Sequence, residues 1–195
     1  MACTIALAKG TLARATKLSW KMLAFSGFTK ARPRPLDLSA LVSGWAEGQD
    51  PEFRARRLAL ACAEVPQISA DPEQVLMLLD ELLLNAREAM VEAGLVEGQV
   101  RVRVFRGAAG SDAGGFWVAE RPGGGDTICL EVANDGTRPD DEILGRMFDP
   151  FFSTKFTGRG MGLPSLLGIL KVHGAGLQVL PQGEADLAFR IHFPL

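Results

Sequence analysis

The sequence has little cysteine and no long apolar run. Its three cysteines in 195 residues are Cys3, Cys62 and Cys129. They are too few and too scattered for a disulfide framework or a cysteine metal site, which favours a reducing compartment. Every apolar run is well short of the roughly 18 residues that a membrane-spanning helix needs, so we expect no membrane insertion of this segment.

Histidine is also scarce, since only His173 and His192 are present. His173 follows a predicted helix, and His192 lies in a predicted terminal strand. We expect both to be neutral side chains that are satisfied by the surrounding structure.

Acidic residues are missing from the first 36 positions, which contain seven Lys or Arg side chains. Such a segment is typical of a targeting peptide, of a nucleic-acid arm, or of a helix whose partner lies elsewhere. Apolar residues fall at loosely helical spacing over residues 11–28, and Pro33 and Pro35 then predict an extended linker. We favour the unpartnered helix and expect no nucleic-acid binding.

Helical and strand-like patterns alternate along the chain and predict an α/β fold. The expected architecture is a two-layer sandwich, with a mixed, mainly antiparallel sheet and helices on one face. The helix at 73–93 is the clearest element, because its apolar residues form a wide stripe. Further helices are predicted within 36–45 and 162–173, and strands at 57–63, 99–106, 116–119, 127–133, 177–180 and 188–193.

Two groups of residues carry the chemistry. Glu81 and Asn85 are four apart, so they share one helical face and could hold Mg²⁺ with its waters against a polyphosphate. On spacing alone, the favoured interpretation is that Asn85, with Arg87 and Glu88, lies on the solvated side of an amphipathic helix. Glycines at 158, 160 and 162 precede a predicted helix, where exposed backbone N–H groups can bind phosphate.

The order of these segments carries a resemblance. The run from Glu81 to Met90 is followed by Asn134-Asp135-Gly136, by Phe148-Asp149-Pro150-Phe151-Phe152, and by Gly158-Arg159-Gly160-Met161-Gly162-Leu163. This order resembles the N, G1, F and G2 boxes of the ATP-binding catalytic domain (HATPase_c) of sensor histidine kinases, in the GHKL superfamily that includes gyrase, Hsp90 and MutL. The resemblance covers about residues 36–195.

The resemblance implies binding of ATP and Mg²⁺. Asn85 would ligate the metal ion, Glu81 would be the acid/base or polarising carboxylate, and the hinge at 148–152 would pack differently in an open and a closed lid. The implied nucleotide-binding residues are Asn85, Arg87, Asn134, Gly136, Lys155, Thr157, Gly158, Arg159, Gly160, Gly162 and Leu163.

The resemblance also implies a division of the chain and a set of partners. Residues 1–35 would be a remnant of the dimerisation-hairpin helix and its linker, and residues 36–195 the catalytic domain. The phosphoacceptor histidine would come from a missing segment of a longer chain or from another chain. A response regulator receiver domain, a homodimer contact and a cytoplasmic location are expected.

Two positions depart from the family pattern. Asn134 stands where the family has the aspartate that recognises adenine, and Arg138 replaces a glycine. Arg138 would be strained if the site needs a positive φ; alternatively, the loop takes another path and Arg138 pairs with Asp140 or Asp141. These changes keep open a second hypothesis, a degenerate domain that acts as a protein-binding or phosphotransfer scaffold.

Overall fold

The protein is described by a computed structural model. The description covers residues 16, 19, 21–27, 30–108, 114–119, 122–123, 125–154, 160–181 and 187–195. None of the helices in these ranges is both long enough and apolar enough to cross a membrane.

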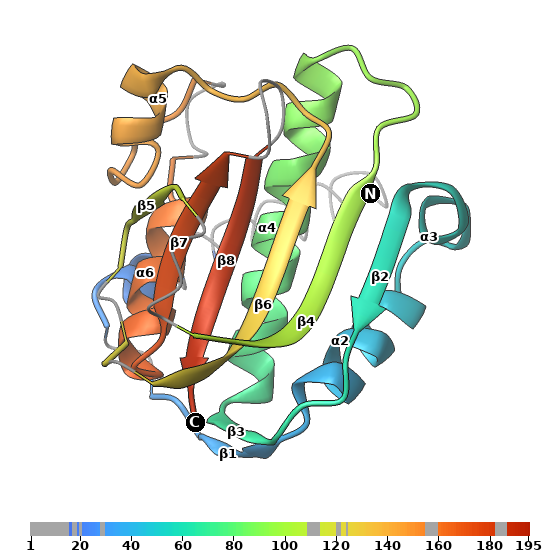
Figure 1. The fold of residues 1–195 in the computed structure, drawn as a ribbon. Helices are drawn as coiled ribbons and strands as arrows, with labels where there is room; N and C mark the ends of the chain where they lie inside the picture. Colours follow the sequence, from blue (N-terminus) through green and yellow to red (C-terminus); the bar gives the residue numbers. More distant parts are fainter. Residues whose placement is uncertain are drawn as a thin grey trace, which may run out of the picture.

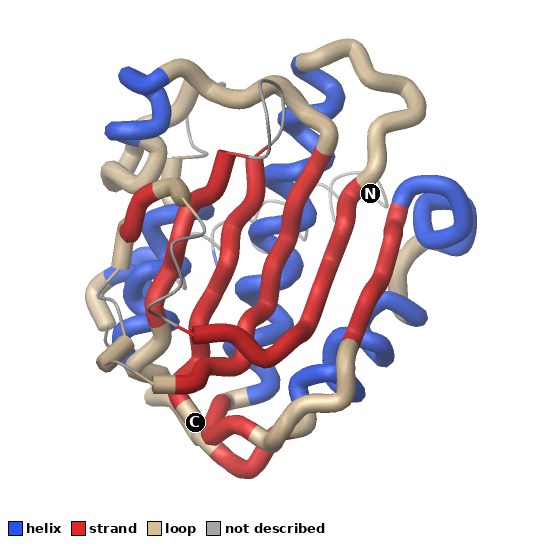
Figure 2. Tube along the Cα trace, viewed as in Figure 1, coloured by secondary structure: helices blue, strands red, loops and turns tan. Residues whose placement is uncertain are grey.

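A six-stranded sheet forms one layer of the fold, in the order β2-β4-β6-β8-β7-β5 (Figures 1 and 2). The edge strand β2 is parallel to β4, and every other neighbouring pair is antiparallel. The strands are β2 (Leu58–Cys62), β4 (Val100–Ala108), β5 (Phe116–Trp117), β6 (Asp126–Asn134), β7 (Gly176–Pro181) and β8 (Leu187–Pro194). This sheet confirms the mixed, mainly antiparallel arrangement predicted from the sequence.

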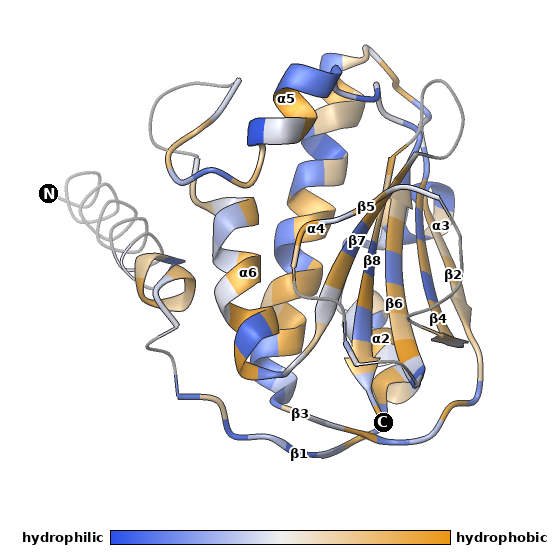
Figure 3. Cartoon of the chain, turned by 60° about the vertical axis from the view of Figure 1, so that its left-hand side comes forward, coloured by the Kyte–Doolittle hydropathy of each residue, from blue (hydrophilic) through white to orange (hydrophobic). Residues whose placement is uncertain are grey.

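Helices form the second layer. Figure 3 shows α4 and α6 against one face of the sheet, with α5 near the upper end of α4. The helices are α2 (Leu38–Glu47), α3 (Pro51–Arg57), α4 (Pro72–Glu92), α5 (Asp141–Arg146) and α6 (Gly162–Val172). Two short strands, β1 (Arg34–Leu36) and β3 (Ile68–Ala70), pair antiparallel beside this layer.

The position of α4 is fixed at its first turn. Asp71 caps the helix by accepting hydrogen bonds from the backbone N–H groups of Glu73 and Gln74, and Pro72 occupies the first turn. Burial alone would raise the pKa of Asp71. Backbone N–H donors, including that of Arg32, outweigh burial and hold this pKa below its ordinary value.

The core lies between α4, α6 and the sheet. Leu78, Leu79 and Leu82 of α4 are almost completely buried and belong to one core cluster with the sheet residues Leu130 and Phe189. Alternate side chains of a strand point to opposite faces. Glu131 and Ala133 therefore face away from the helices, while Leu130, Val132 and Asn134 face α4.

The observed elements match the predicted ones closely where the apolar pattern is long. The helix predicted at 73–93 is α4, and the helix predicted at 162–173 is α6. The strand predicted at 57–63 is β2, although its first residue belongs to α3, which the sequence reading did not include. Of the helix predicted within 11–28, residues 21–25 are helical, while most of the remainder lies outside the described residues.

Candidate functional site

One face of α4 carries the central residues of the candidate site. Glu81, Asn85 and Ala89 follow one another at intervals of one helical turn. Glu81 is buried, whereas Asn85 and Ala89 are half-buried. With a rise of 1.5 Å per residue, the row spans about 12 Å. Segments that are far apart in the sequence can therefore contact the row separately, one at the Glu81 end and another at the Ala89 end.

The glycine loop meets the Glu81 end of this row. A Cβ atom on Gly162 would lie 2.9 Å from Oε2 of Glu81, so the start of α6 lies directly beside this carboxylate. Gly162 begins α6, whose first turn has no side-chain cap and no acidic residue. Backbone N–H groups at such a helix start lack intrahelical partners and favour an anion.

The segment after β6 meets the Ala89 end of the row. A Cβ atom on Gly136 would lie 2.8 Å from the Cβ of Ala89 and 2.5 Å from Nδ2 of Asn134. Asn134 is 4% exposed, and its side chain faces the helical layer. Neither the Asn85 amide nor the Asn134 amide hydrogen-bonds to another described residue, which leaves both groups available to a ligand.

Asp135 and Arg138 fix the loop that follows Asn134. Burial alone would raise the pKa of Asp135, but the backbone N–H of Gln99 and the guanidinium of Arg101 hold it below its ordinary value. Arg138 forms a 3.1 Å ion pair with Asp141, which is one of the two pairings expected if the loop takes its own path. Among the described non-glycine residues only Phe151 has a positive φ, so Arg138 carries no left-handed strain.

The aromatic hinge at 148–152 is attached at three points. The Phe148 ring packs edge-on against Phe189, with 6.3 Å between the ring centroids, and Arg146 lies over the Phe152 ring. Phe151 is 68% exposed and has a φ of 66°. Its backbone N–H donates a 2.7 Å hydrogen bond to the carbonyl of Gly160, which joins the hinge directly to the glycine loop.

Several predicted site residues stand apart from this cluster. Arg87 is two residues from Asn85, which turns it to another side of α4, and its guanidinium carbon lies 3.8 Å from the centroid of the Phe53 ring. Leu163 is half-buried and packs on the edge of the core. Four predicted residues lie outside the described part of the chain: Lys155, Thr157, Gly158 and Arg159.

Both histidines are buried away from the cluster on α4, and His173 has the satisfied structural setting that was expected. Nε2 of His173 accepts a 3.0 Å hydrogen bond from the backbone N–H of Asp71, while Nδ1 lies 2.8 Å from the carbonyl of Ile169. A ring nitrogen that accepts a hydrogen bond carries no proton, so this imidazole is neutral. His192 is 1% exposed, its Nδ1 lies 3.1 Å from Oγ1 of Thr127, and its ring lies against Trp117 at a tilt of 45°.

The sequence reading missed one residue of this region. Nζ of Lys21 lies 2.7 Å from Oε2 of Glu81, and the two side chains are 14% and 9% exposed. This ion pair joins residues 60 positions apart. The only sequence signal is the basic, acid-poor character of the N-terminal segment, which does not single out Lys21.

The donor set suits a hard cation. Asn85 has an amide oxygen, the kind of ligand that Mg²⁺ prefers while it retains several waters, and it lies one helical turn from Glu81, whose carboxylate is paired with Lys21. No group of three or more His, Cys, Asp or Glu side chains within the described residues could hold a metal ion. A metal ion at α4 would therefore need ligands from a bound molecule as well as from the protein.

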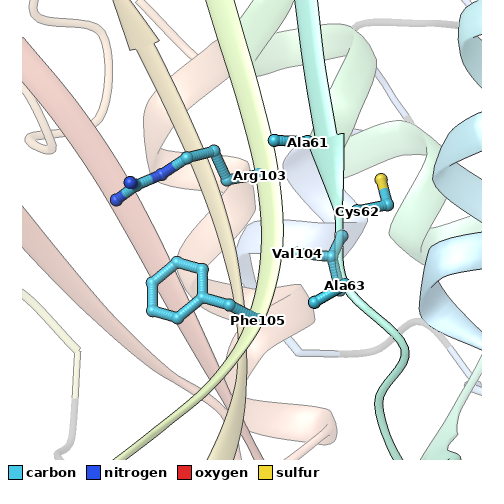
Figure 4. A pocket seen from close by; sticks show the side chains of 6 residues that line it. All are labelled: Ala61, Cys62, Ala63, Arg103, Val104 and Phe105. Carbon is cyan, nitrogen blue, oxygen red and sulfur yellow. The ribbon is translucent and has the colours of Figure 1, made fainter.

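A separate hollow lies at the edge of the sheet formed by β2 and β4. Its volume is about 400 Å³, and it is lined by residues 61–63 of the β2 region and 103–105 of β4. Figure 4 shows the Arg103 and Phe105 side chains on the side of β4 that points away from the Cys62 sulfur. Burial raises the pKa of the Cys62 thiol above its ordinary value, which disfavours the reactive thiolate. The hollow shares no residue with the cluster on α4.

Comparison with known proteins points to one family. Residues 70–195 match the family model described as "Histidine kinase-, DNA gyrase B-, and HSP90-like ATPase". Sensor kinase CckA of Brucella abortus (strain 2308) is 29% identical over 189 residues, which cover 93% of this chain and 19% of CckA. The C4-dicarboxylate transport sensor protein DctS of Rhodobacter capsulatus is 28% identical over 163 residues, or 82% of this chain and 22% of DctS. The chain thus spans about a fifth of the length of these relatives.

Solved structures share the fold. Full-length ShkA in complex with AMPPNP matches with a TM-score of 0.65 at 20% identity, over 91% of this chain and 35% of ShkA. The nucleotide-free catalytic domain of histidine kinase ThkA matches with a TM-score of 0.62 at 19% identity, over 84% of this chain and 95% of that domain.

Proposed function

Because the chain belongs to the histidine kinase-, DNA gyrase B- and HSP90-like ATPase family, we propose that it binds Mg-ATP and presents the γ-phosphate to a histidine of a sensor-kinase dimerisation helix. The observation that supports this proposal most strongly is the convergence on α4. Gly162 approaches Glu81, Gly136 approaches both Ala89 and the Asn134 amide, and Asn85 lies between the two ends of the row.

In this proposal different groups of residues bind the adenine, the metal ion and the phosphates of Mg-ATP. Asn134 and Gly136 lie at the adenine end, and Asn85 supplies an oxygen to Mg²⁺. The uncapped start of α6, with Gly160, Gly162 and Leu163, faces the phosphates. Lys155, Thr157, Gly158 and Arg159, outside the described residues, stay in the proposed phosphate loop. Arg87 is left out, since it stacks on Phe53.

Positioning and charge neutralisation supply most of the catalysis in phosphoryl transfer. A bound Mg²⁺ would neutralise phosphate charge. The N–H groups at the start of α6 would hold the phosphates, and the Glu81 carboxylate would polarise the incoming imidazole or accept its proton. The buried setting of Glu81 keeps bulk water away from that carboxylate.

Asn134 gives the adenine end a distinct expected behaviour. An amide can accept from the adenine amino group and donate to a ring nitrogen, as Asn does elsewhere with adenine. It lacks the charge of a carboxylate and can flip. We therefore expect ATP to bind about tenfold more weakly than to an aspartate-containing site, and guanine to be rejected less strongly.

The partners follow from the same proposal. Residues 1–35 are assigned to the remnant of a dimerisation helix with its linker, and residues 36–195 to the catalytic domain. Met22, Leu23 and Phe25 are 43%, 52% and 39% exposed, which favours docking on a partner helix or on a second copy of the chain. A response regulator receiver domain would accept the phosphoryl group from the histidine, and the use of ATP places the domain in the cytoplasm.

The scaffold hypothesis is not favoured, because the described parts of all four boxes come together in the fold. Calorimetric titration with ATP, with and without Mg²⁺, tests the enzymatic proposal. Asn85→Ala is expected to weaken Mg-ATP binding by about 10- to 100-fold, since it removes a ligand of a charged group. Val91→Ala, at a 78% exposed position of the same helix, should bind as the wild type does. Equal affinity of the wild type and Asn85→Ala would refute the proposed role of Asn85.

A further inference from the structure

The N-terminal segment is docked on the catalytic domain through a close backbone contact. Ala24 is 0% exposed, and its carbonyl group fills the space that a side chain on Gly168 of α6 would occupy. The Cα of Phe25 lies 3.0 Å from the same position. Figure 3 shows this short helical piece beside α6. Residues 21–27 are therefore held at a defined place relative to α6.

This docking delivers one cation to the proposed nucleotide site. The Lys21 ammonium is bound to Glu81 and lies 3.9 Å from the position of a Cβ on Gly162. It therefore lies at the first residue of α6, where the phosphates of a bound nucleotide are proposed to lie. The remainder of the segment contacts α6 farther along that helix.

The Lys21 ammonium lies at the start of α6, and this position favours an anion beside it. A helix start carries a partial positive charge, and a nearby ammonium is repelled by it. Glu81 is the one acidic side chain that pairs with Lys21 among the described residues. A largely buried ion pair of this kind is weak evidence for stability, because the cost of desolvation offsets the attraction. The pair therefore contributes little to holding the segment, while the ammonium and the N–H groups at the start of α6 lie together on the side where an anion is favoured.

We propose that Lys21 completes the phosphate end of the ATP site, so that triphosphate binding and docking of residues 21–27 favour one another. This inference rests on the proposed function and adds a binding residue from outside the matched family region, which begins at residue 70. In this proposal the Lys21 ammonium, held by Glu81 at the start of α6, would contact the phosphates. Linkage requires the coupling to be reciprocal: ATP must hold the segment in place by the same factor.

The test compares ATP with AMP, since AMP lacks the β- and γ-phosphates. Lys21→Gln in the full chain is expected to weaken ATP binding about tenfold and to change AMP binding by less than about twofold. Lys21→Arg should restore most of the lost ATP affinity. The matched control is Lys30→Gln, an exposed lysine of the same segment, which should behave as the wild type does.

A second variant removes the docking and leaves Lys21 intact. Gly168→Ala introduces a methyl group that collides with the Ala24 carbonyl, so it should weaken ATP binding by a similar factor. The double variant Lys21→Gln, Gly168→Ala should lose little more, because both changes break one coupling. In the wild type, hydrogen exchange over residues 21–27 should slow with Mg-ATP and not with AMP.

The outcomes separate this inference from the function on which it rests. If the wild type binds ATP and Lys21→Gln binds it equally well or more tightly, the inference fails while the proposed function stands. Equal loss of ATP and AMP affinity would show a merely structural role for Lys21 and would also overturn the inference. If the wild type binds neither nucleotide, the proposed function itself fails.

Discussion

The backbone N–H of Phe151 donates a 2.7 Å hydrogen bond to the carbonyl oxygen of Gly160, and this bond joins the aromatic hinge to the glycine loop. Phe151 has a φ of 66°, a conformation that costs a non-glycine residue about 1–2 kcal/mol. Backbone strain of this kind persists where the surroundings impose it, and it clusters at ligand clamps and switches.

Substitution of Gly160 tests this junction. A Cβ atom at position 160 would overlap the main chain of Phe151, so Gly160→Ala must shift the loop. Loss of one well-placed phosphate contact predicts about tenfold weaker ATP binding, measured by calorimetry, with little change in the melting temperature. Gly145→Ala in α5 is the matched control, because no neighbouring atom lies within 4 Å of its added methyl group. Equal ATP affinities for the two variants would contradict the assignment.

Restoration of a carboxylate at position 134 should separate ligand binding from stability. Asn134→Asp is expected to bind ATP about tenfold more tightly, because a charged acceptor faces the adenine amino group. It should also discriminate more strongly against GTP. Without nucleotide the variant should melt at a lower temperature, since a carboxylate at a 4% exposed position is poorly solvated. Titration with both nucleotides, combined with thermal unfolding, checks the prediction; weaker ATP binding by the variant would oppose it.

The Asp71 cap of α4 should make the free energy of unfolding depend on pH in the acidic range. The folded-state pKa of Asp71 lies below its ordinary value, so the carboxylate stabilises the fold. This contribution is fully present above the unfolded pKa of about 3.9 and is lost as the pH falls through the folded value. Asp71→Asn keeps an oxygen acceptor but loses the charge, which predicts a loss of about 1 kcal/mol at pH 7.

Urea unfolding of the wild type and Asp71→Asn at pH 7 and at pH 3 provides the measurement. The difference in unfolding free energy between the two proteins should be smaller at pH 3. A difference that stays constant or grows as the pH falls would mean that the charge of Asp71 does not stabilise the helix. Asp135, whose pKa is also lowered, is present in both proteins and cancels in the comparison.

The long periodic elements were predictable from the sequence, and the contacts between distant segments were not. The wide apolar stripe of α4 follows from the helical period, and the glycines of the G1 and G2 boxes were found by their order along the chain, although the contacts that require them come from distant segments. The short helix α3 was missed although Asp50 caps it and Pro51 begins it, because seven residues give little periodicity. The strands β1 and β3, of three residues each, are too short to show alternation.

The candidate site likewise has a part that the sequence predicted and a part that it did not. Glu81, Gly136 and Gly162 lie in the predicted cluster. This part of the site was predictable because the boxes that contain these residues follow the order of the family. The stacking of Arg87 on Phe53 and the pairing of Lys21 with Glu81 depend on how α3 and the N-terminal segment dock. Docking is set by tertiary packing, which no local pattern in the sequence reports.

Hydrogen exchange measured with and without Mg-ATP tests most directly whether separated segments form one nucleotide site. We predict slower exchange in residues 134–139 and in residues 160–165, with the same dependence on ATP concentration, because both segments would contact one bound molecule. Slower exchange confined to the β2 and β4 residues around the hollow of Figure 4, or no change at saturating ATP, would contradict the account.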